Sequence, residues 1–145
     1  MHFTIWYNTK RMKKIGKIDI SELNVPPEKH EYETAKYFAN RGYDVTFLAP
    51  HYAEGMHNPD FMMSSKIWET KSPIGHSIRT FEDHYRKAKK QSPHIIFDLR
   101  RLEINEEQIC LKMLKKKNKS PNIKTLLTIT RDGRLLTIKG KFDNI

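Results

Sequence analysis

Apolar residues along this chain recur either every three to four positions, as on one face of a helix, or in short β-branched and aromatic runs typical of strands. The first helical stretch opens at Val25-Pro26-Pro27, because proline suits a first helical turn, and we expect it to run to about Arg41 and end at Gly42. Its apolar stripe consists of Ala35, Phe38 and Ala39. The same spacing places Glu31 on this stripe, where an acid must be neutralised, hydrogen-bonded or turned into a site.

The segments that follow predict alternating strands and helices. A nearly continuous apolar run, Tyr43–Ala49, predicts a central strand, and Thr80 with Asp83 three positions later predicts the capped start of a helix that continues to Ser92. The buried strand His94–Leu99 comes next, and a helix between two strands favours a parallel crossover. The C-terminal part adds a helix over Glu106–Lys117 and a hairpin over 123–129 and 134–138 around Asp132-Gly133.

The stretch 58–73 carries the most unusual polar pattern. Two short strands joined at Ser64-Ser65 would place Asp60 opposite Glu69, and alternation would put Lys71 on the same face. Ser-Ser is a weaker turn signal than Asn-Gly, so this register depends on the turn. Two carboxylates facing each other at cross-strand distance destabilise a hairpin unless a cation lies between them. The pattern therefore favours a site for a divalent cation.

The length of 145 residues is sufficient for one domain with a sizeable core. We expect residues 1–24 to form a peripheral arm, with a short strand near Phe3–Tyr7, and residues 25–145 to form the main domain. No apolar run approaches the roughly 20 residues of a membrane span, and no signal-peptide pattern opens the chain. The single Cys110 excludes an internal disulfide and a Cys-rich zinc site, and we expect it to be a small apolar residue on a helix.

The net charge of +10 is unevenly distributed. Residues 31–99 hold nine basic and nine acidic side chains, which cancel, whereas residues 1–30 hold six against three and residues 100–145 hold twelve against five. Basic flanks around a locally acidic centre suit a polyanionic substrate such as nucleic acid. A lysine-rich solvated surface, an anionic membrane or an acidic partner protein remain alternatives to that interpretation.

The chemistry available to the hairpin is that of a metal-dependent phosphodiesterase. Asp60 and Glu69 offer the oxygen ligands that Mg²⁺ or Mn²⁺ prefers, and Lys71 beside them can position or deprotonate a water or stabilise the transition state. Glu31 from the first helix could reach the same site, and Arg79 is placed to contact a phosphate. Gln91, near the buried face of its helix, could orient the substrate.

Each of these residues also has a simpler interpretation. The spacing from Asp60 to Glu69 and Lys71 is common by itself, so the two last residues could form a solvated strand face. Glu31 could be a satisfied helix acid, and Arg79 a surface cation. No histidine pair has the H-x-x-x-H or H-x-H spacing, which makes a zinc site improbable.

Longer strings are more specific than the acid–acid–lysine spacing. The chain contains PPEKHEYETAKYFANRGYDVTFLAP, then NPD, then WETKSPIGHSIRT, and finally AKKQSPHIIFDLRR. The order of a helix with an acid, Pro-Asp, Glu-x-Lys, helix and strand resembles the PD-(D/E)XK nuclease superfamily. The strings, over about residues 25–101, resemble the CdiA-type C-terminal toxin nucleases of bacterial contact-dependent growth inhibition.

This resemblance implies a fold, an activity and partners. The fold would be α/β (α+β): a restriction-endonuclease-like core, helix–strand–hairpin–helix–strand around a central mixed sheet, with a C-terminal helix and β-hairpin. The activity would be tRNA cleavage that depends on Mg²⁺ or Mn²⁺, in the cytoplasm of a target cell, by a toxin with a cognate immunity protein.

Residue roles follow from the same resemblance. Asp60 and Glu69 would be metal ligands, Lys71 the catalytic lysine and Glu31 the helix-borne acid. The flanking positions Ser72, Arg79, Thr80 and Gln91 would contact substrate or support the site. Two other functions remain open at this point: a DNA endonuclease of the same fold in phage or mobile-element defence, and a catalytically silent nucleic-acid-binding module.

Overall fold

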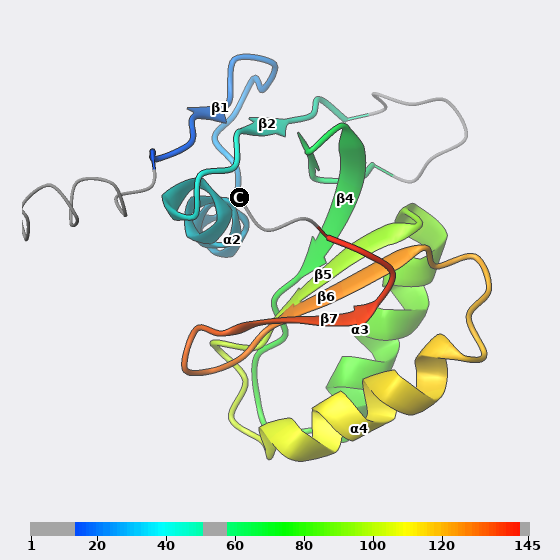
Figure 1. Cartoon of the computed structure of the whole chain (residues 1–145). Helices are drawn as coiled ribbons and strands as arrows, with labels where there is room; N and C mark the ends of the chain where they lie inside the picture. Colours follow the sequence, from blue (N-terminus) through cyan, green and yellow to red (C-terminus); the bar gives the residue numbers. More distant parts are fainter. Residues whose placement is uncertain (1–13, 51–57, 143–145) are drawn as a thin grey trace, which may run out of the picture.

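The computed structural model describes residues 14–50 and 58–142, so the strand expected near Phe3–Tyr7 lies outside the described residues. In the described part, a mixed α+β fold contains one seven-stranded sheet and three helices. The strands are β1 (Ile18–Asp19), β2 (Val45–Phe47), β3 (Phe61–Met63), β4 (Lys66–Lys71), β5 (His94–Asp98), β6 (Thr125–Ile129) and β7 (Leu135–Lys139). The helices are α2 (Lys29–Asn40), α3 (Ile78–Gln91) and α4 (Glu106–Lys117). The expected mixed sheet with a C-terminal helix and hairpin is confirmed (Figure 1).

The strands of the sheet lie in the order in which they occur in the chain, from β1 to β7. The pairs β1–β2, β4–β5 and β5–β6 are parallel, and β2–β3, β3–β4 and β6–β7 are antiparallel. Because α3 connects β4 to β5, the predicted parallel crossover is confirmed. The β4 strand, which carries the acid–x–lysine pattern, therefore occupies the middle of the sheet.

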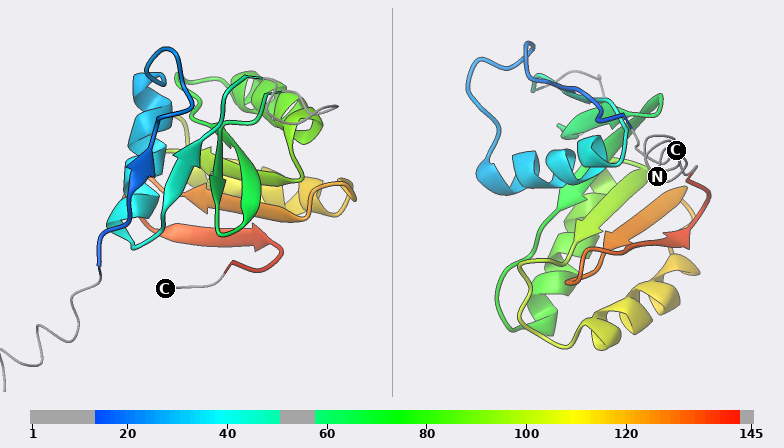
Figure 2. Two further views of the ribbon diagram at one scale, coloured as in Figure 1. Left: turned by 90° about the horizontal axis from the view of Figure 1, so that it is seen from above. Right: turned by 60° about the vertical axis from the view of Figure 1, so that its left-hand side comes forward.

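Each face of the sheet has its own hydrophobic core. On one face α3 and α4 pack through Phe81, Tyr85 and Met113 onto β5. On the opposite face α2 packs through Ala35 and Phe38 onto a second cluster. The separation of the helices is visible in the two views of Figure 2. Trp68, fully buried in the second cluster, confirms that this side of β4 belongs to the core.

The hairpin has the register that the sequence predicts. Met63 pairs with Lys66 and Phe61 with Trp68, so Ser64-Ser65 forms the turn. Both serines adopt positive φ angles, 52° and 61°. Two consecutive positive values are typical of the type I′ turn, whose twist matches that of the paired strands. The weak turn signal is thus overridden by the pairing of the two strands.

We expect the double substitution Ser64→Asn and Ser65→Gly to raise the free energy of unfolding by about 1 kcal/mol, because Asn and Gly adopt positive φ at a lower cost than serine. Urea unfolding followed by circular dichroism measures the change. Ser65→Ala, which tolerates positive φ poorly, should lower stability. A stabilising alanine substitution would contradict the turn assignment.

Three sequence predictions on element boundaries and position are wrong. The first helix begins at Lys29 rather than at the prolines, since the Glu31 carboxylate accepts a bond from the Glu28 N–H at 3.0 Å and closes the helix start. Helix α3 begins at Ile78, two residues before Thr80, because Ser77 is its N-cap and accepts from the Arg79 N–H at 3.1 Å. The run 43–49 yields only the short β2, second from an edge of the sheet rather than central.

The C-terminal half follows the sequence pattern closely. Helix α4 has the predicted bounds, and Gly133, with φ of 86°, turns the hairpin between β6 and β7. Cys110 is partly buried and packs against the α3–α4 core, as expected for a small apolar side chain. In the described residues, no helix combines the length and apolar character required to cross a lipid bilayer.

Candidate active site

Strand β4 carries an acid and a lysine on the same face. Glu69 is in register with Ile95 and Lys71 with Phe97, and both β5 residues belong to the core beneath α3 and α4. The two β4 side chains therefore point to the α3 face. The Lys71 Nζ lies 2.9 Å from Glu69 Oε2, and the Glu69 residue is only 2% exposed. The result is an ion pair largely removed from water.

The Asp60 carboxyl lies beside that of Glu69, and each influences the pKa of the other. The predicted pairing of Asp60 with Glu69 is not part of the β3–β4 ladder, whose last pair is Phe61 with Trp68, and the Asp60 N–H donates to the Trp68 carbonyl at 3.0 Å. Its Oδ2 accepts two bonds, from the Thr70 N–H and the Thr70 hydroxyl, each at 2.8 Å. Thr70 thus fixes the orientation of this carboxylate.

Glu31 reaches the same place from the first turn of α2. It lines one cavity with Asp60, Glu69 and Lys71. A hydrogen bond between the Glu31 and Asp60 carboxyls contributes to raising the pKa of Glu31. Glu31 of α2, Asp60 just before β3 and Glu69 of β4 therefore share with Lys71 a single pocket of about 350 Å³.

The electrostatics of the pocket show an excess of negative charge. Burial first, and then the bond and charge of Asp60, raise the pKa of Glu31 to about 7. Burial and the Glu69 charge raise the pKa of Asp60 to about 6, although bonds from Glu31 and Thr70 oppose the shift. Burial also raises the pKa of Glu69 in spite of the Lys71 ammonium. Lys71 and Arg101 do not compensate the four carboxylates that line this cavity, the three above and Glu28, and such an excess of acids is the condition in which a cation binds.

Whether the residues fit a metal ion can be judged from their oxygen atoms. Glu69 Oε1 is buried and has no hydrogen-bond partner in the structure, which leaves a carboxylate oxygen available for a ligand. Within the described ranges, no group of three or more His, Cys, Asp or Glu side chains has the arrangement of a complete metal site. Two carboxylates are nevertheless sufficient for Mg²⁺, which commonly takes its other ligands from water and substrate phosphate. The donor set fits such an open site.

The structure brings together some of the predicted flanking residues and not others. Ser72 and Gln91 line the cavity that contains Lys71. Arg79 instead lines a different cavity, together with Glu82, Asp83, Tyr85, Arg86, Lys89 and Lys116. Thr80 is not among the residues that line the acidic cavity. Both residues lie in the first turn of α3, at the opposite end of the helix from Gln91.

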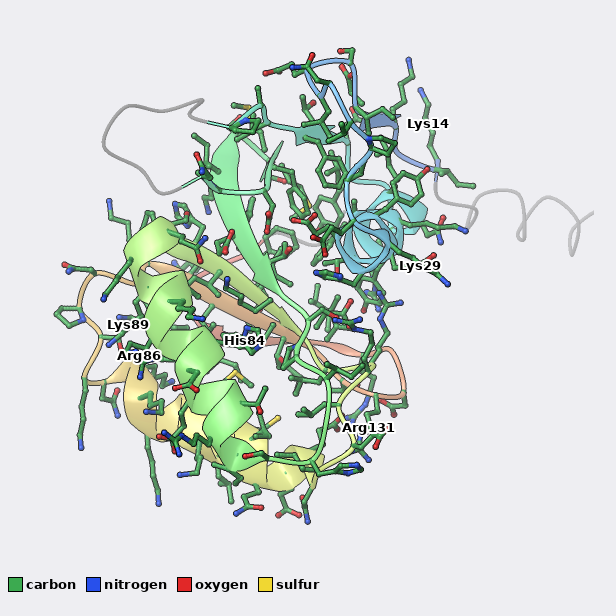
Figure 3. The ribbon with its side chains drawn as sticks, turned by 180° about the vertical axis from the view of Figure 1, so that it is seen from behind. Lys14, Lys29, His84, Arg86, Lys89 and Arg131 are labelled. Atoms are coloured by element: carbon green, nitrogen blue, oxygen red, sulfur yellow. The ribbon has the colours of Figure 1, made fainter. Side chains whose placement is uncertain are left out.

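Sequence reasoning missed two residues of the cavity wall. His84 projects from the side of α3 that faces β4, whereas Arg86 and Lys89 lie on its outer side (Figure 3). Burial and the charges of Lys71 and Lys87 lower the pKa of His84. Its position seven residues before Gln91, two turns along one helix face, is the signal that could have revealed it. Arg101 follows β5 and is bonded to Ser72, a contact that no spacing rule predicts.

The raised pKa values predict how stability depends on pH. In EDTA, we expect the free energy of unfolding to fall by about 1–3 kcal/mol as the pH rises from about 5 to about 7, with the half-exposed Glu31 contributing less because water screens it. In this window the folded chain holds protons on Glu31 and Asp60 that the unfolded chain has released. Above this pH window both carboxyls are ionised in the folded and in the unfolded chain. Only in the folded chain do their negative charges lie close together and repel each other.

Urea unfolding at a series of pH values measures this dependence. The substitution Asp60→Asn keeps an oxygen for the two Thr70 bonds and removes the charge, so the curve should become flatter and the stability at pH 8 should rise. A stability that increases with pH over this window in the wild-type chain would contradict the electrostatic description.

Comparisons with known proteins agree with this fold. Residues 57–135, more than half of the chain, match the family described as the contact-dependent growth inhibition CdiA C-terminal domain. Among solved structures, the CdiA-CT/CdiI toxin and immunity complex from Burkholderia pseudomallei matches with a TM-score of 0.64 and 19% sequence identity. The alignment covers 86% of this chain and 99% of that chain. No curated protein matches the chain.

The chain therefore shares the mixed α+β fold of a bacterial toxin domain, with an acidic pocket at the centre of its sheet. It belongs to the contact-dependent growth inhibition CdiA C-terminal domain family. The resemblance to this family predicted from the sequence is confirmed, and the chain is a toxin domain of contact-dependent growth inhibition.

Proposed function

We propose that the domain is a metal-dependent endoribonuclease of the PD-(D/E)XK type that cleaves tRNA. The observation that carries the proposal is the buried Lys71–Glu69 pair beside Asp60, with one Glu69 oxygen unbonded in an open cavity. An acid pair with an adjacent lysine is one arrangement that supports metal-assisted hydrolysis of a phosphodiester. Catalysis of this kind would also account for a buried cluster of like charges, which weakens the fold.

The residues of the pocket have separate tasks in this proposal. A divalent cation held by Asp60 and Glu69 would activate a water molecule and neutralise charge on the phosphoryl oxygens. The Lys71 ammonium, held by Glu69 at 2.9 Å, is placed to orient the attacking water or to stabilise negative charge on the phosphate. Thr70 keeps the Asp60 carboxylate in place through its two bonds. Glu31, whose pKa is raised to about 7, can exchange a proton near neutral pH.

The substrate class is supported by charge. The chain carries a net charge of +10, with its excess outside the segment that holds the acidic pocket. Helix α3 presents Arg86 and Lys89 on its outer side, adjacent to the wall that carries His84 (Figure 3). A folded RNA would be bound mainly through its phosphates and its shape, which suits such a basic surface.

The test is a cleavage assay with the purified chain. Total tRNA and plasmid DNA are incubated with the wild type and with Asp60→Asn, in Mg²⁺ or in EDTA. We expect discrete tRNA fragments only for the wild type in Mg²⁺. The matched control is Asp83→Asn, which removes an exposed acid paired with Arg86 at 3.2 Å and should cleave like the wild type.

The outcomes separate the candidate functions. Cleavage by Asp60→Asn at the wild-type rate, or in EDTA, would contradict the metal site. Cutting of DNA with intact tRNA would identify a DNA endonuclease of the same fold. An absence of cleavage in every sample would favour a catalytically silent nucleic-acid-binding module.

We also propose a cognate immunity protein and a cytoplasmic site of action in the target cell. The similar solved structure is a toxin and immunity complex, which supports a protein partner for this domain. An acidic partner would complement the basic flanks or the cations around the pocket. Growth arrest on expression of the wild type alone, relieved by co-expression of such a partner, is the corresponding result in cells.

A further inference from the structure

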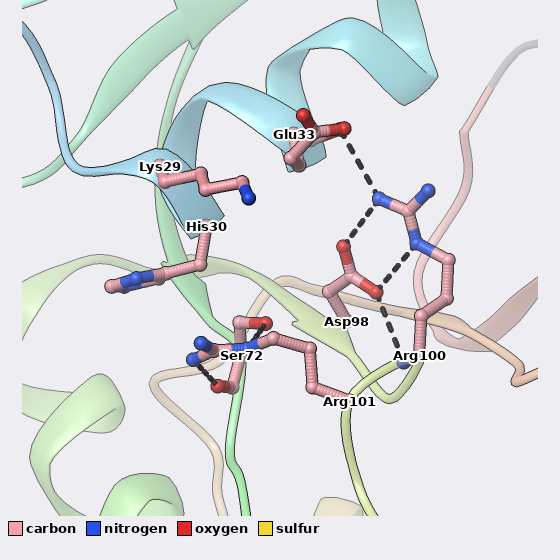
Figure 4. A pocket seen from close by; sticks show the side chains of 7 residues that line it. All are labelled: Lys29, His30, Glu33, Ser72, Asp98, Arg100 and Arg101. Carbon is pink, nitrogen blue, oxygen red and sulfur yellow. Dashed lines mark hydrogen bonds and ion pairs between the residues drawn. The ribbon is translucent and has the colours of Figure 1, made fainter.

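A second cavity, of about 370 Å³, lies beside the acidic pocket. It is lined by basic residues from two places: Lys29 and His30 at the start of α2, and Arg100 and Arg101 just after β5. Figure 4 shows these side chains around one opening, with Asp98 on its wall. None of the four basic residues was assigned a role by the sequence or by the proposed catalytic mechanism.

The buried acid of this cavity, Asp98, is already neutralised by Arg100. Asp98 is 2% exposed and receives bonds from the Arg100 guanidinium, at 2.9 Å from Nε and 2.7 Å from the second nitrogen. The Thr34 hydroxyl donates a further bond to Asp98 at 2.7 Å. Arg100 and Asp98 therefore form a closed structural pair, and neither charge is available to a ligand.

Two cations remain uncompensated. Within the described residues, no carboxylate forms an ion pair with Lys29 or Arg101. The Arg101 Nε donates to the Ser72 hydroxyl at 3.0 Å, and a second guanidinium nitrogen donates to the Ser72 carbonyl. These neutral partners fix the position of the guanidinium without cancelling its charge. A fixed guanidinium and a nearby ammonium are a typical pair of phosphate ligands.

The basic cavity shares a wall with the acidic pocket. His30, Ser72 and Arg101 line both. Ser72 immediately follows Lys71, so the orienting contact to Arg101 begins one residue from the catalytic lysine. A strand whose phosphate occupies the acidic pocket would pass directly over Arg101 into the second cavity.

We propose that the basic cavity is a substrate subsite that binds a backbone phosphate of the RNA strand, next to the phosphate that is cleaved. Lys29 and Arg101 are its ligands, and Ser72 is a positioning residue that holds Arg101. The proposal rests on the nuclease function proposed above. Glu33, an exposed acid on the cavity lining, opposes the bound phosphate and lowers its affinity.

The first test is equilibrium binding of labelled tRNA to the Glu69→Gln chain in EDTA, measured by fluorescence anisotropy at several salt concentrations. We expect Lys29→Gln and Arg101→Gln each to weaken binding about 10-fold and to reduce the salt slope by about 0.7–0.9. Glu33→Gln should tighten binding. The matched control is Lys66→Gln, a lysine at the start of β4 beside the hairpin turn and outside the basic flanks, which should leave affinity and slope unchanged.

The second test uses a short RNA that spans the cleaved bond, with one neighbouring phosphate replaced by a neutral methylphosphonate. We expect this change to lower kcat/KM of the wild type about 10-fold and to have no further effect in Lys29→Gln. An equal effect in both chains would overturn the subsite.

The two proposals fail in different ways. A loss of affinity in Lys66→Gln equal to that in Lys29→Gln would mean that the cavity contributes only general charge, and would overturn the subsite even if the chain cleaves RNA. The expected pattern of binding without any cleavage by the wild type would support the subsite and overturn the nuclease function. An absence of tRNA binding would overturn the subsite directly.

Discussion

The substitution Lys71→Met is expected to lower kcat for RNA cleavage by about 10²–10⁴-fold with little change in KM. The ammonium acts next to the reacting phosphate, 2.9 Å from Glu69 Oε2, whereas substrate affinity comes mainly from cations elsewhere on the surface. Methionine fills a similar volume and cannot orient water or stabilise charge. Single-turnover cleavage of tRNA at saturating enzyme measures the chemical step.

The control for Lys71 lies on the same strand. Lys66 is at the start of β4, beside the hairpin turn, and Lys66→Met should retain wild-type cleavage. If the Lys71–Glu69 pair acts as a unit, Lys71→Met with Glu69→Gln should lose little more activity than Lys71→Met alone. The proposed role of Lys71 would be contradicted if the activity losses of the two single variants multiplied in the double variant. Cleavage by Lys71→Met close to the wild-type rate would contradict it as well.

The substitution Asp98→Ala is expected to reduce the free energy of unfolding by about 3 kcal/mol. It leaves the Arg100 guanidinium without its carboxylate at the end of β5 and removes the Thr34 contact that ties α2 to the sheet. Arg100 also lies over the Tyr37 ring, at 5.2 Å from its centroid, and donates to the Glu33 carbonyl. Urea unfolding at pH 7 measures the loss.

Asp98→Asn provides the matched comparison. The amide keeps one oxygen for the Arg100 backbone or side chain and similar volume, so its cost should be smaller than that of alanine. The double variant Asp98→Ala with Arg100→Met should recover part of the stability, because no guanidinium without its carboxylate remains against the Tyr37 ring. This description would be contradicted if the double variant were less stable than Asp98→Ala by the full amount that Arg100→Met costs on its own.

The hairpin was the most predictable part of the site. Local rules fixed it: a turn between two short apolar strands sets the register, and alternation then places Glu69 and Lys71 on one face. The helix period placed Glu31 on the buried side of α2 for the same reason. Features that depend only on neighbours in sequence could therefore be predicted without a structure.

Contacts between segments that are distant in sequence could not be predicted by these local rules. Asp98 bonds to Thr34 across 64 positions, and Arg101 to Ser72 across 29, and neither pair has a spacing that a helix or strand would impose. The start of α3 was mistaken because both Ser77 and Thr80 can cap a helix, and only packing of Phe81 and Tyr85 onto β5 selects between them. Arg79 was assigned to the substrate site from its place after the acid–lysine pattern and from the family resemblance, whereas the structure places it on a different cavity.

The agreement between strand order and chain order has a consequence for how the domain folds. Each strand can add to the sheet as soon as its neighbour is formed, so no segment has to thread between others already in place. Contacts over long distances in sequence, such as the bond from Tyr37 to the Gly133 carbonyl across 96 positions, can then close on a sheet that is already formed. Pairing between strands that are neighbours in sequence avoids the largest loop-closure costs and favours spontaneous refolding. A chain that reaches its place of action in an extended state could thus regain its structure without assistance.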